Sequence, residues 1–187
     1  MLLRRLCILL LALIPLTGCT VLAVGGMVAT TSVILDSRQV NTQIDDSGLH
    51  LHVVQGIQSD ERLKNQRIRV VAYNGDVLLV GQVASLELKQ RAERVAVESA
   101  TILTVFNELK VGDPKGFIDR SKDSWITTRI KANLLSSNEI DTSGVKVVTE
   151  ASEVFLLGIV DEPAAQHAVR VARNTPGVTR VVRAFSL

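Results

Sequence analysis

Few side chains in this 187-residue chain are of the types that perform acid–base catalysis or bind metals. Histidine occurs only at His50, His52 and His167. If Leu49–Val53 were a strand, His50 and His52 would share a face, as in some metal sites, but a helix points them apart and no third ligand is evident. We therefore expect three exposed helix histidines and no metal site.

Paired carboxylates could act as general acid and base, and three acidic pairs occur: Asp45-Asp46, Asp60-Glu61 and Asp161-Glu162. Each pair stands where a helix is expected to begin, and there acidic side chains complement the helix dipole without any catalytic role. The sequence contains no phosphate-binding loop and no nucleophile elbow. We expect no catalytic residues, no enzyme activity, no cofactor and no small-molecule substrate.

The N-terminus has the pattern of a secretory signal peptide over residues 1–18. Arg4 and Arg5 precede an apolar run, Leu6–Leu16, that is too short to span a bilayer. The chain has 21 basic and 19 acidic residues, so removing this segment leaves equal numbers of each. A mature chain with no net charge argues against nucleic-acid binding.

The signal segment ends in Leu16-Thr17-Gly18-Cys19, which resembles the lipobox of secreted bacterial lipoproteins. The resemblance implies cleavage before Cys19 and acylation of that residue, with a fatty acid such as palmitate. Each buried CH₂ contributes about 0.8 kcal/mol, so several chains anchor the protein permanently. Cys7 leaves with the signal, so no free thiol remains. The alternative is an uncleaved anchor with an incidental cysteine.

The residue after the lipobox cysteine bears on localisation. Thr20 stands where, by resemblance to enterobacterial lipoproteins, an aspartate would signal retention in the inner membrane. We therefore expect the protein at the cell outer membrane, lipid-anchored on the periplasmic face. From Thr20 to Asp45 we expect a tether, whose apolar part, Val21–Leu35, lies on the membrane or packs on a domain; a spanning helix is the alternative.

The rest of the chain contains an internal repeat. Residues 69–83 align without a gap to residues 146–160. Six residues of the first copy are identical at the aligned positions of the second: Val70, Val71, Val77, Leu79, Gly81 and Val83. In each copy β-branched runs flank a turn, at Asn74-Gly75-Asp76 and at Ala151-Ser152, which is typical of an antiparallel hairpin. The same small fold is therefore expected twice.

Helical spacing surrounds each hairpin. One apolar stripe precedes it and one follows it in each copy: Leu49, Val53 and Ile57, then Leu88, Ala92 and Val95; and Ile126, Ile130 and Leu134, then Ala165, Ala168 and Val171. A closing strand follows at Ile102–Val111 and at Val178–Phe185. The order αββαβ predicts an α+β fold in which a three-stranded mixed sheet packs on two helices.

This pattern resembles the BON domain, named for osmotically induced and nodulation-related bacterial proteins. The residues that carry the resemblance are Val80-Gly81-Gln82-Val83, Leu157-Gly158-Ile159-Val160, the helix after each, and Pro176-Gly177-Val178. Copy one departs with Ala100-Thr101-Ile102 at the last position. The whole chain resembles the dual-BON outer-membrane lipoproteins of proteobacteria, which implies one BON domain at 46–113 and a second at 117–187, after the lipidated tether at 19–45. We expect Gly81 and Gly158 to lie where the backbone approaches too closely for a side chain.

The helix expected at Ser124–Ser136 has more apolar residues than one core face requires. With Ile126, Ile130 and Leu134 inward, the residues that face outward or lie at the edge are Trp125, Thr128, Arg129, Lys131, Ala132 and Leu135. Arg120 and Lys122 add positive charge just upstream. A membrane surface would suit this face, because Trp favours headgroups and cations pair with phosphate. Packing of Trp125 and Leu135 on copy one or another chain is the alternative.

BON domains are regarded as phospholipid-binding, so the resemblance favours the hypothesis that this face binds lipid. It implies that the second domain binds anionic phospholipid through Trp125, Thr128, Arg129, Lys131, Ala132 and Leu135, and that the protein supports envelope integrity, with division sites as one place of action. The competing hypothesis is a protein-interaction module that docks an outer-membrane assembly or a cell-wall component.

Overall fold

The computed structural model describes residues 40–114, 120–136 and 140–186. The predicted signal peptide, Cys19, Thr20 and the apolar stretch Val21–Leu35 lie outside these residues. Within the described ranges, no helix is both long enough and apolar enough to cross a membrane. Residues 36–187 form one compact unit, which contains both copies of the repeat.

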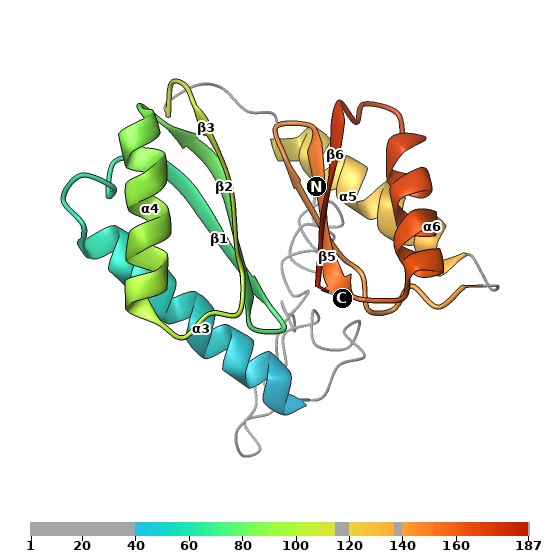
Figure 1. The fold of residues 1–187 in the computed structure, drawn as a ribbon. Helices are drawn as coiled ribbons and strands as arrows, with labels where there is room; N and C mark the ends of the chain where they lie inside the picture. Colours follow the sequence, from blue (N-terminus) through green and yellow to red (C-terminus); the bar gives the residue numbers. More distant parts are fainter. Residues whose placement is uncertain (1–39, 115–119, 137–139, 187) are drawn as a thin grey trace, which may run out of the picture. The chain divides into compact units, whose positions relative to one another are not determined.

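The structure repeats one order of elements twice, as the sequence predicts (Figure 1). Domain 1 consists of α3 (Val40–Ser59), β1 (Arg67–Tyr73), β2 (Asp76–Val83), α4 (Leu86–Ser99) and β3 (Val105–Val111). Domain 2 consists of α5 (Arg120–Leu135), β4 (Lys146–Glu150), β5 (Glu153–Ile159), α6 (Glu162–Arg173) and β6 (Arg180–Ser186). The helix α3 begins inside the segment assigned to the tether, and α5 begins four residues before the predicted Ser124.

Each domain has a mixed three-stranded sheet, which confirms the predicted fold. The strands β1 and β2 pair antiparallel, with Val70 opposite Leu79, and β2 pairs with β3 in parallel. The sheet β4-β5-β6 repeats this topology. The closing strands begin later than predicted because the residues before them bond the hairpin turn instead: Leu103 N–H donates to the Gly75 carbonyl, and Thr179 N–H to that of Ser152.

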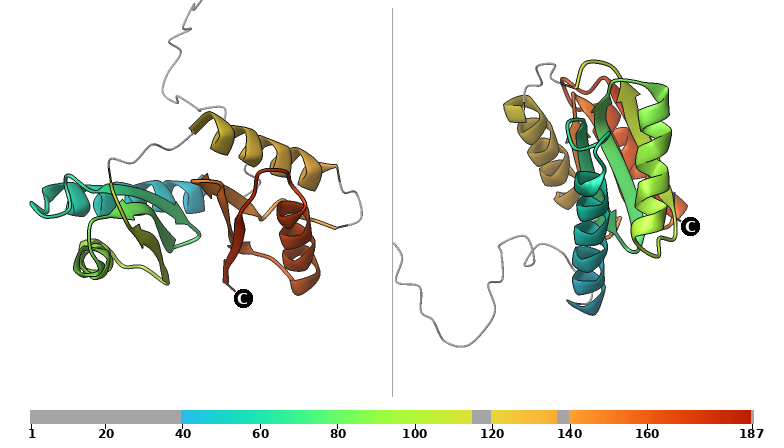
Figure 2. Two further views of the ribbon diagram at one scale, coloured as in Figure 1. Left: turned by 90° about the horizontal axis from the view of Figure 1, so that it is seen from above. Right: turned by 90° about the vertical axis from the view of Figure 1, so that its left-hand side faces the viewer.

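Two helices cover one face of each sheet, as the views in Figure 2 show for the pairs α3 with α4 and α5 with α6. The expected apolar stripes of α3 and α5 are buried against their own sheets. The core of domain 1 includes Leu49, Val53, Ile57, Val77 and Leu79. The core of domain 2 includes Ile126, Ile130, Leu134, Val154 and Leu156.

The other face of each sheet is buried too, because the two sheets share a third apolar cluster. It consists of Tyr73, Leu78 and Val80 from domain 1 and Val148, Phe155, Leu157 and Ala184 from domain 2. The central strands β2 and β5 are therefore buried on both faces. This contact joins the domains within one compact unit, and it extends the small core that a domain of this size can build alone.

Gly81 and Gly158 lie where a side chain would not fit, as predicted. A Cβ on Gly81 would approach the Arg67 carbonyl oxygen to 2.0 Å, and a Cβ on Gly158 would approach that of Gly144 to 2.2 Å. Their φ angles of +126° and +145° are open to glycine but strained for other residues. Both glycines therefore allow close strand pairing and do not form a ligand-binding loop.

Candidate functional site

The candidate site is the outward face of α5, and the core packing of this helix decides which residues it presents. Ile126 and Ile130 are fully buried, and Leu134 is 4% exposed. Asp123 is buried as well. These four residues place the opposite face of the helix in solvent.

All six residues predicted for the lipid-binding face are exposed: Trp125, Thr128, Arg129, Lys131, Ala132 and Leu135. Residues Trp125 and Leu135 are 52% and 73% exposed, which is high for large apolar residues. Neither is buried against domain 1. The structure thus brings these residues together on one exposed helix surface.

The charge on this surface has one sign. Four cations lie on α5, at Arg120, Lys122, Arg129 and Lys131, and all four are exposed. The only acidic residue of the helix is Asp123, which points inward. Within the described ranges, Arg120, Arg129 and Lys131 form no ion pair. The surface can therefore attract anions without competition from acidic neighbours on its own helix.

The equivalent helix of domain 1 is an internal control. The helix α3 contains no Lys or Arg between Val40 and Ser59. When the repeats are aligned by their hairpins, Gly48 stands at the position of Trp125 and His52 at that of Arg129. The fold alone therefore does not require a cationic, Trp-bearing helix, and only domain 2 has one.

Asp123 holds α5 on its hairpin, and sequence reasoning missed this role. Its carboxylate accepts hydrogen bonds of 2.8 Å from the backbone N–H groups of Ala151 and Ser152. Both turn residues have positive φ, at 52° and 64°, the values of a type I′ turn. Asp46 does the same for Asn74 and Gly75 at 2.9 Å. The equal spacing of an Asp and a turn in both copies was the available signal.

The prediction that all three acidic pairs start helices was wrong for two of them. Asp45 and Asp46 lie inside α3, which begins at Val40. Asp60 follows the end of α3 and accepts hydrogen bonds from Arg62 N–H (2.9 Å) and from the Arg91 guanidinium (2.7 Å). Although burial alone would raise the pKa of Asp60, these bonds hold it below its ordinary value.

The third acidic pair does begin a helix. Asp161 is the N-cap of α6 and accepts a hydrogen bond from Ala164 N–H at 2.8 Å. Glu162 lies in the first turn, where hydrogen bonds from Arg183 and Gln166 lower its pKa. The contacts are structural: Asp161 caps the helix, and the Glu162–Arg183 pair joins the start of α6 to β6.

The histidines do not converge. His50 and His52 are exposed on α3, as predicted, but His167 is half-buried on α6 and its Nε2 atom has no hydrogen-bond partner among the described residues. No group of three side chains that could hold a metal ion occurs within the described ranges.

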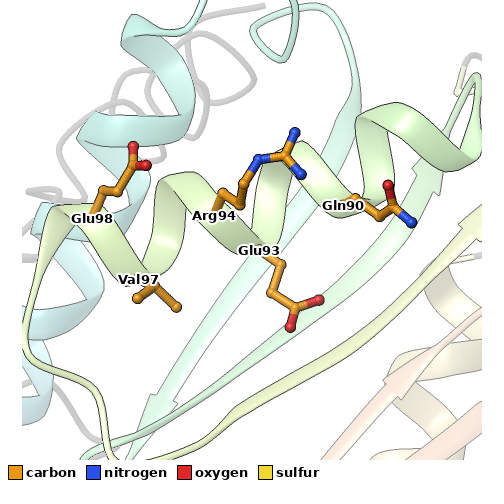
Figure 3. Close-up of a pocket in the computed structure, with 5 residues that line it drawn as sticks. All are labelled: Gln90, Glu93, Arg94, Val97 and Glu98. Carbon is orange, nitrogen blue, oxygen red and sulfur yellow. The ribbon is translucent and has the colours of Figure 1, made fainter.

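A hollow of about 380 Å³ lies over the outer side of α4 (Figure 3). Its described lining residues all belong to this helix: Gln90, Glu93, Arg94, Val97 and Glu98. Charges of both signs and one valine from a single helix do not converge on a reacting atom. The hollow therefore adds no candidate chemistry to the α5 face.

Comparison with known proteins agrees with this architecture. The BON domain model matches residues 45–113 and 122–187. The outer membrane lipoprotein DolP of Haemophilus influenzae is 38% identical over 184 residues, which cover 98% of this chain and 95% of that protein. A 21 kDa hemolysin of Actinobacillus pleuropneumoniae is 40% identical over 153 residues, covering 81% of this chain and 79% of that protein.

A third relative links the chain to the wider family. The osmotically inducible protein Y of Escherichia coli is 30% identical over 150 residues, covering 77% of this chain and 73% of that protein. With two matched domains and a relative aligned over nearly the full length, the chain belongs to the BON-domain family and is an outer-membrane lipoprotein.

Proposed function

We propose that this lipoprotein binds anionic phospholipid through the exposed face of α5 and thereby supports the integrity of the cell envelope, with division sites as one place of action. The observation that carries the proposal is the asymmetry between the two copies. The helix α5 exposes four cations and Trp125, whereas the equivalent α3 has no cation.

The chemistry of this face matches a lipid headgroup layer. Tryptophan favours the membrane interface, where its ring contacts acyl chains and its N–H stays hydrated. A basic residue near an anionic membrane contributes about 1 kcal/mol, so four together supply a few kcal/mol of electrostatic attraction to the membrane. The contact is weak enough to respond to lipid composition.

The anchor would supply the remaining membrane affinity. In the proposal the signal peptide is removed and Cys19 is acylated on the periplasmic side of the outer membrane. The lipid anchor holds the protein near the surface at high effective concentration, so the weak α5 contact decides where on that surface it resides. Replacing Cys19 by Ser should release the protein from the membrane fraction.

The direct experiment is co-sedimentation of residues 36–187 with vesicles that contain or lack phosphatidylglycerol. We expect binding to anionic vesicles only, and loss of that binding in Trp125→Glu and Leu135→Glu. The matched control is Leu86→Glu, which adds the same charge at a 60% exposed leucine of domain 1. Circular dichroism verifies that each variant keeps its fold.

The experiment also addresses a protein partner. If the Trp125 and Leu135 face docks an outer-membrane assembly or a cell-wall component instead, the wild type will bind neither vesicle. Salt provides a second criterion, because headgroup binding weakens as ionic strength rises, whereas an apolar protein interface does not.

A further inference from the structure

The β4–β5 turn is held from two sides. From one side, Asp123 of α5 bonds the backbone of Ala151 and Ser152. From the other, domain 1 contacts the two residues that flank them, Glu150 and Glu153. The turn that supports the first helical turn of α5 therefore also carries two carboxylates that meet the neighbouring domain.

Domain 1 supplies cations to both carboxylates. The guanidinium of Arg67 lies 3.2 Å from the Glu150 carboxylate, and that of Arg69 lies 3.8 Å from it. Lys110, at the end of β3, forms an ion pair with Glu153. The two glutamate side chains are only 11% and 10% exposed, so these pairs are screened less than surface pairs are.

Arg180 of domain 2 is a fourth cation at this contact, and it also reaches domain 1. Its guanidinium contacts Glu153 at 3.2 Å and also pairs with Glu108 of β3. Although burial alone would lower the pKa of Arg180, hydrogen bonds and the charges of Glu108 and Glu153 raise it. Arg180 therefore stays charged at neutral pH.

A polar chain continues from domain 1 into α5 itself. Arg69 donates a hydrogen bond of 3.3 Å to the Thr149 carbonyl, and the hydroxyl groups of Thr149 and Thr127 lie 2.7 Å apart. Thr127 lies on α5, two residues from Trp125. Both the turn and the adjoining strand thus connect the candidate face to domain 1.

The two hairpins differ in how their acidic residues are paired, although the contact residues occupy equivalent positions in the two repeats. Asp76 of domain 1 occupies the position of Glu153, and Ser186 occupies that of Lys110. Ser186 gives the Asp76 carboxylate a hydroxyl group in place of a cation, and the Asp76 Oδ1 atom has no hydrogen-bond partner within the described residues. The hairpin below the cationic helix is the one whose acidic residues receive cations.

We propose that domain 1 completes the lipid-binding face of α5 by neutralising Glu150 and Glu153, so that docking of the two sheets sets the affinity of α5 for anionic phospholipid. This inference rests on the function proposed above. With the domains apart, Glu150 would lose both of its arginine partners and Glu153 would keep only Arg180, so negative charge beside the residues that bond α5 would repel anionic headgroups. By linkage, anionic membranes must in turn favour the docked arrangement.

The test is co-sedimentation of residues 36–187 with phosphatidylglycerol vesicles. Lys110→Glu removes the cation that domain 1 gives to Glu153 and adds a charge that repels it. The control Arg94→Glu makes the same change in net charge on the exposed side of α4. We expect Lys110→Glu to raise the lipid concentration at half-binding about fivefold more than the control.

A second substitution separates neutralisation from nonspecific damage. Adding Glu153→Gln to Lys110→Glu removes the carboxylate that has lost its domain 1 cation, and we expect most of the lost affinity to return. If Lys110→Glu and Arg94→Glu behave alike, or if Glu153→Gln restores nothing, the inference is wrong while the lipid function stands. If the wild type does not distinguish anionic from neutral vesicles, both proposals are wrong.

Discussion

Asp123 on α5 and Asp46 on α3 form the same pair of hydrogen bonds in the two domains. Each carboxylate accepts from two consecutive backbone N–H groups, 28 and 29 residues further along the chain. In both, Oδ2 bonds the first turn residue and Oδ1 the second. The first helix of each domain is thereby fixed to the hairpin that it covers.

Removal of this clamp should destabilise domain 2. Asp123 is buried, and Asp123→Ala would leave two backbone donors without an acceptor. We expect a loss of about 2–4 kcal/mol in the free energy of unfolding, measured by urea denaturation with circular dichroism. A loss below about 0.5 kcal/mol, the range of ordinary surface substitutions, would contradict the role assigned to Asp123.

The turn of domain 2 could be made more stable by substitution. Ala151 and Ser152 have positive φ angles, and in domain 1 the residues with these angles are Asn74 and Gly75. Left-handed backbone costs roughly 1–2 kcal/mol at a residue such as alanine, and less at Asn or Gly. The double substitution Ala151→Asn and Ser152→Gly should therefore stabilise the protein by about 1–2 kcal/mol. Thermal unfolding of the variant beside wild type measures this; a lower melting temperature would contradict the prediction.

Two glycine substitutions should have opposite effects. Gly158→Ala places a Cβ 2.2 Å from the Gly144 carbonyl oxygen at a φ of +145°, so we expect a loss of about 2 kcal/mol or more. Gly48→Ala is the control, because this helical glycine has open space around it. Its substitution should stabilise α3 by about 0.5–1 kcal/mol. Equal effects at both positions would show that the close approach is unimportant.

Asp60 should contribute to acid sensitivity. Since its pKa in the folded protein lies below the ordinary value of 3.8, its stabilising effect is present above that pH and is lost as the pH falls through the folded-state pKa. Asp60→Asn should therefore lower stability at pH 7, and this loss should shrink at a pH below the folded-state pKa, which itself lies under 3.8. The control is Glu61→Gln, at a carboxylate 82% exposed. Urea denaturation at pH 7 and at a series of acidic pH values decides, and a loss that does not change with pH would contradict the assignment.

The sequence predicted each domain but not the contact between them. The repeat, the turn residues and the helical stripes lie close together along the chain, so their spacing indicates αββαβ directly. Sheet-to-sheet docking joins residues such as Tyr73 and Phe155 that are far apart in sequence. One signal was present: the continuous apolar runs Val77–Val80 and Val154–Leu157 are typical of strands buried on both faces.

The exposed residues of α5 were predictable from the sequence, whereas the contacts that hold this helix and its hairpin in place were not. Helical spacing alone separates Ile126 from Trp125, so the exposed residues followed from the sequence. The pairing of Glu150 and Glu153 with Arg67, Arg69 and Lys110 depends on the docking geometry, and a sequence with many surface charges allows many pairings. The role of Asp123 was missed because its partners, the N–H groups of Ala151 and Ser152, lie 28 and 29 residues further along the chain.

Trp125 is the only tryptophan of the chain, so its fluorescence reports on the proposed contact without any label. The most direct test of the central claim is to titrate residues 36–187 with phosphatidylglycerol vesicles and to record the emission maximum. If α5 inserts into the headgroup region, the emission shifts to shorter wavelength with anionic vesicles, not with neutral ones, and the shift diminishes as salt is added. Binding of the protein to anionic vesicles with no change in this emission would contradict the assignment of α5 as the lipid-binding surface.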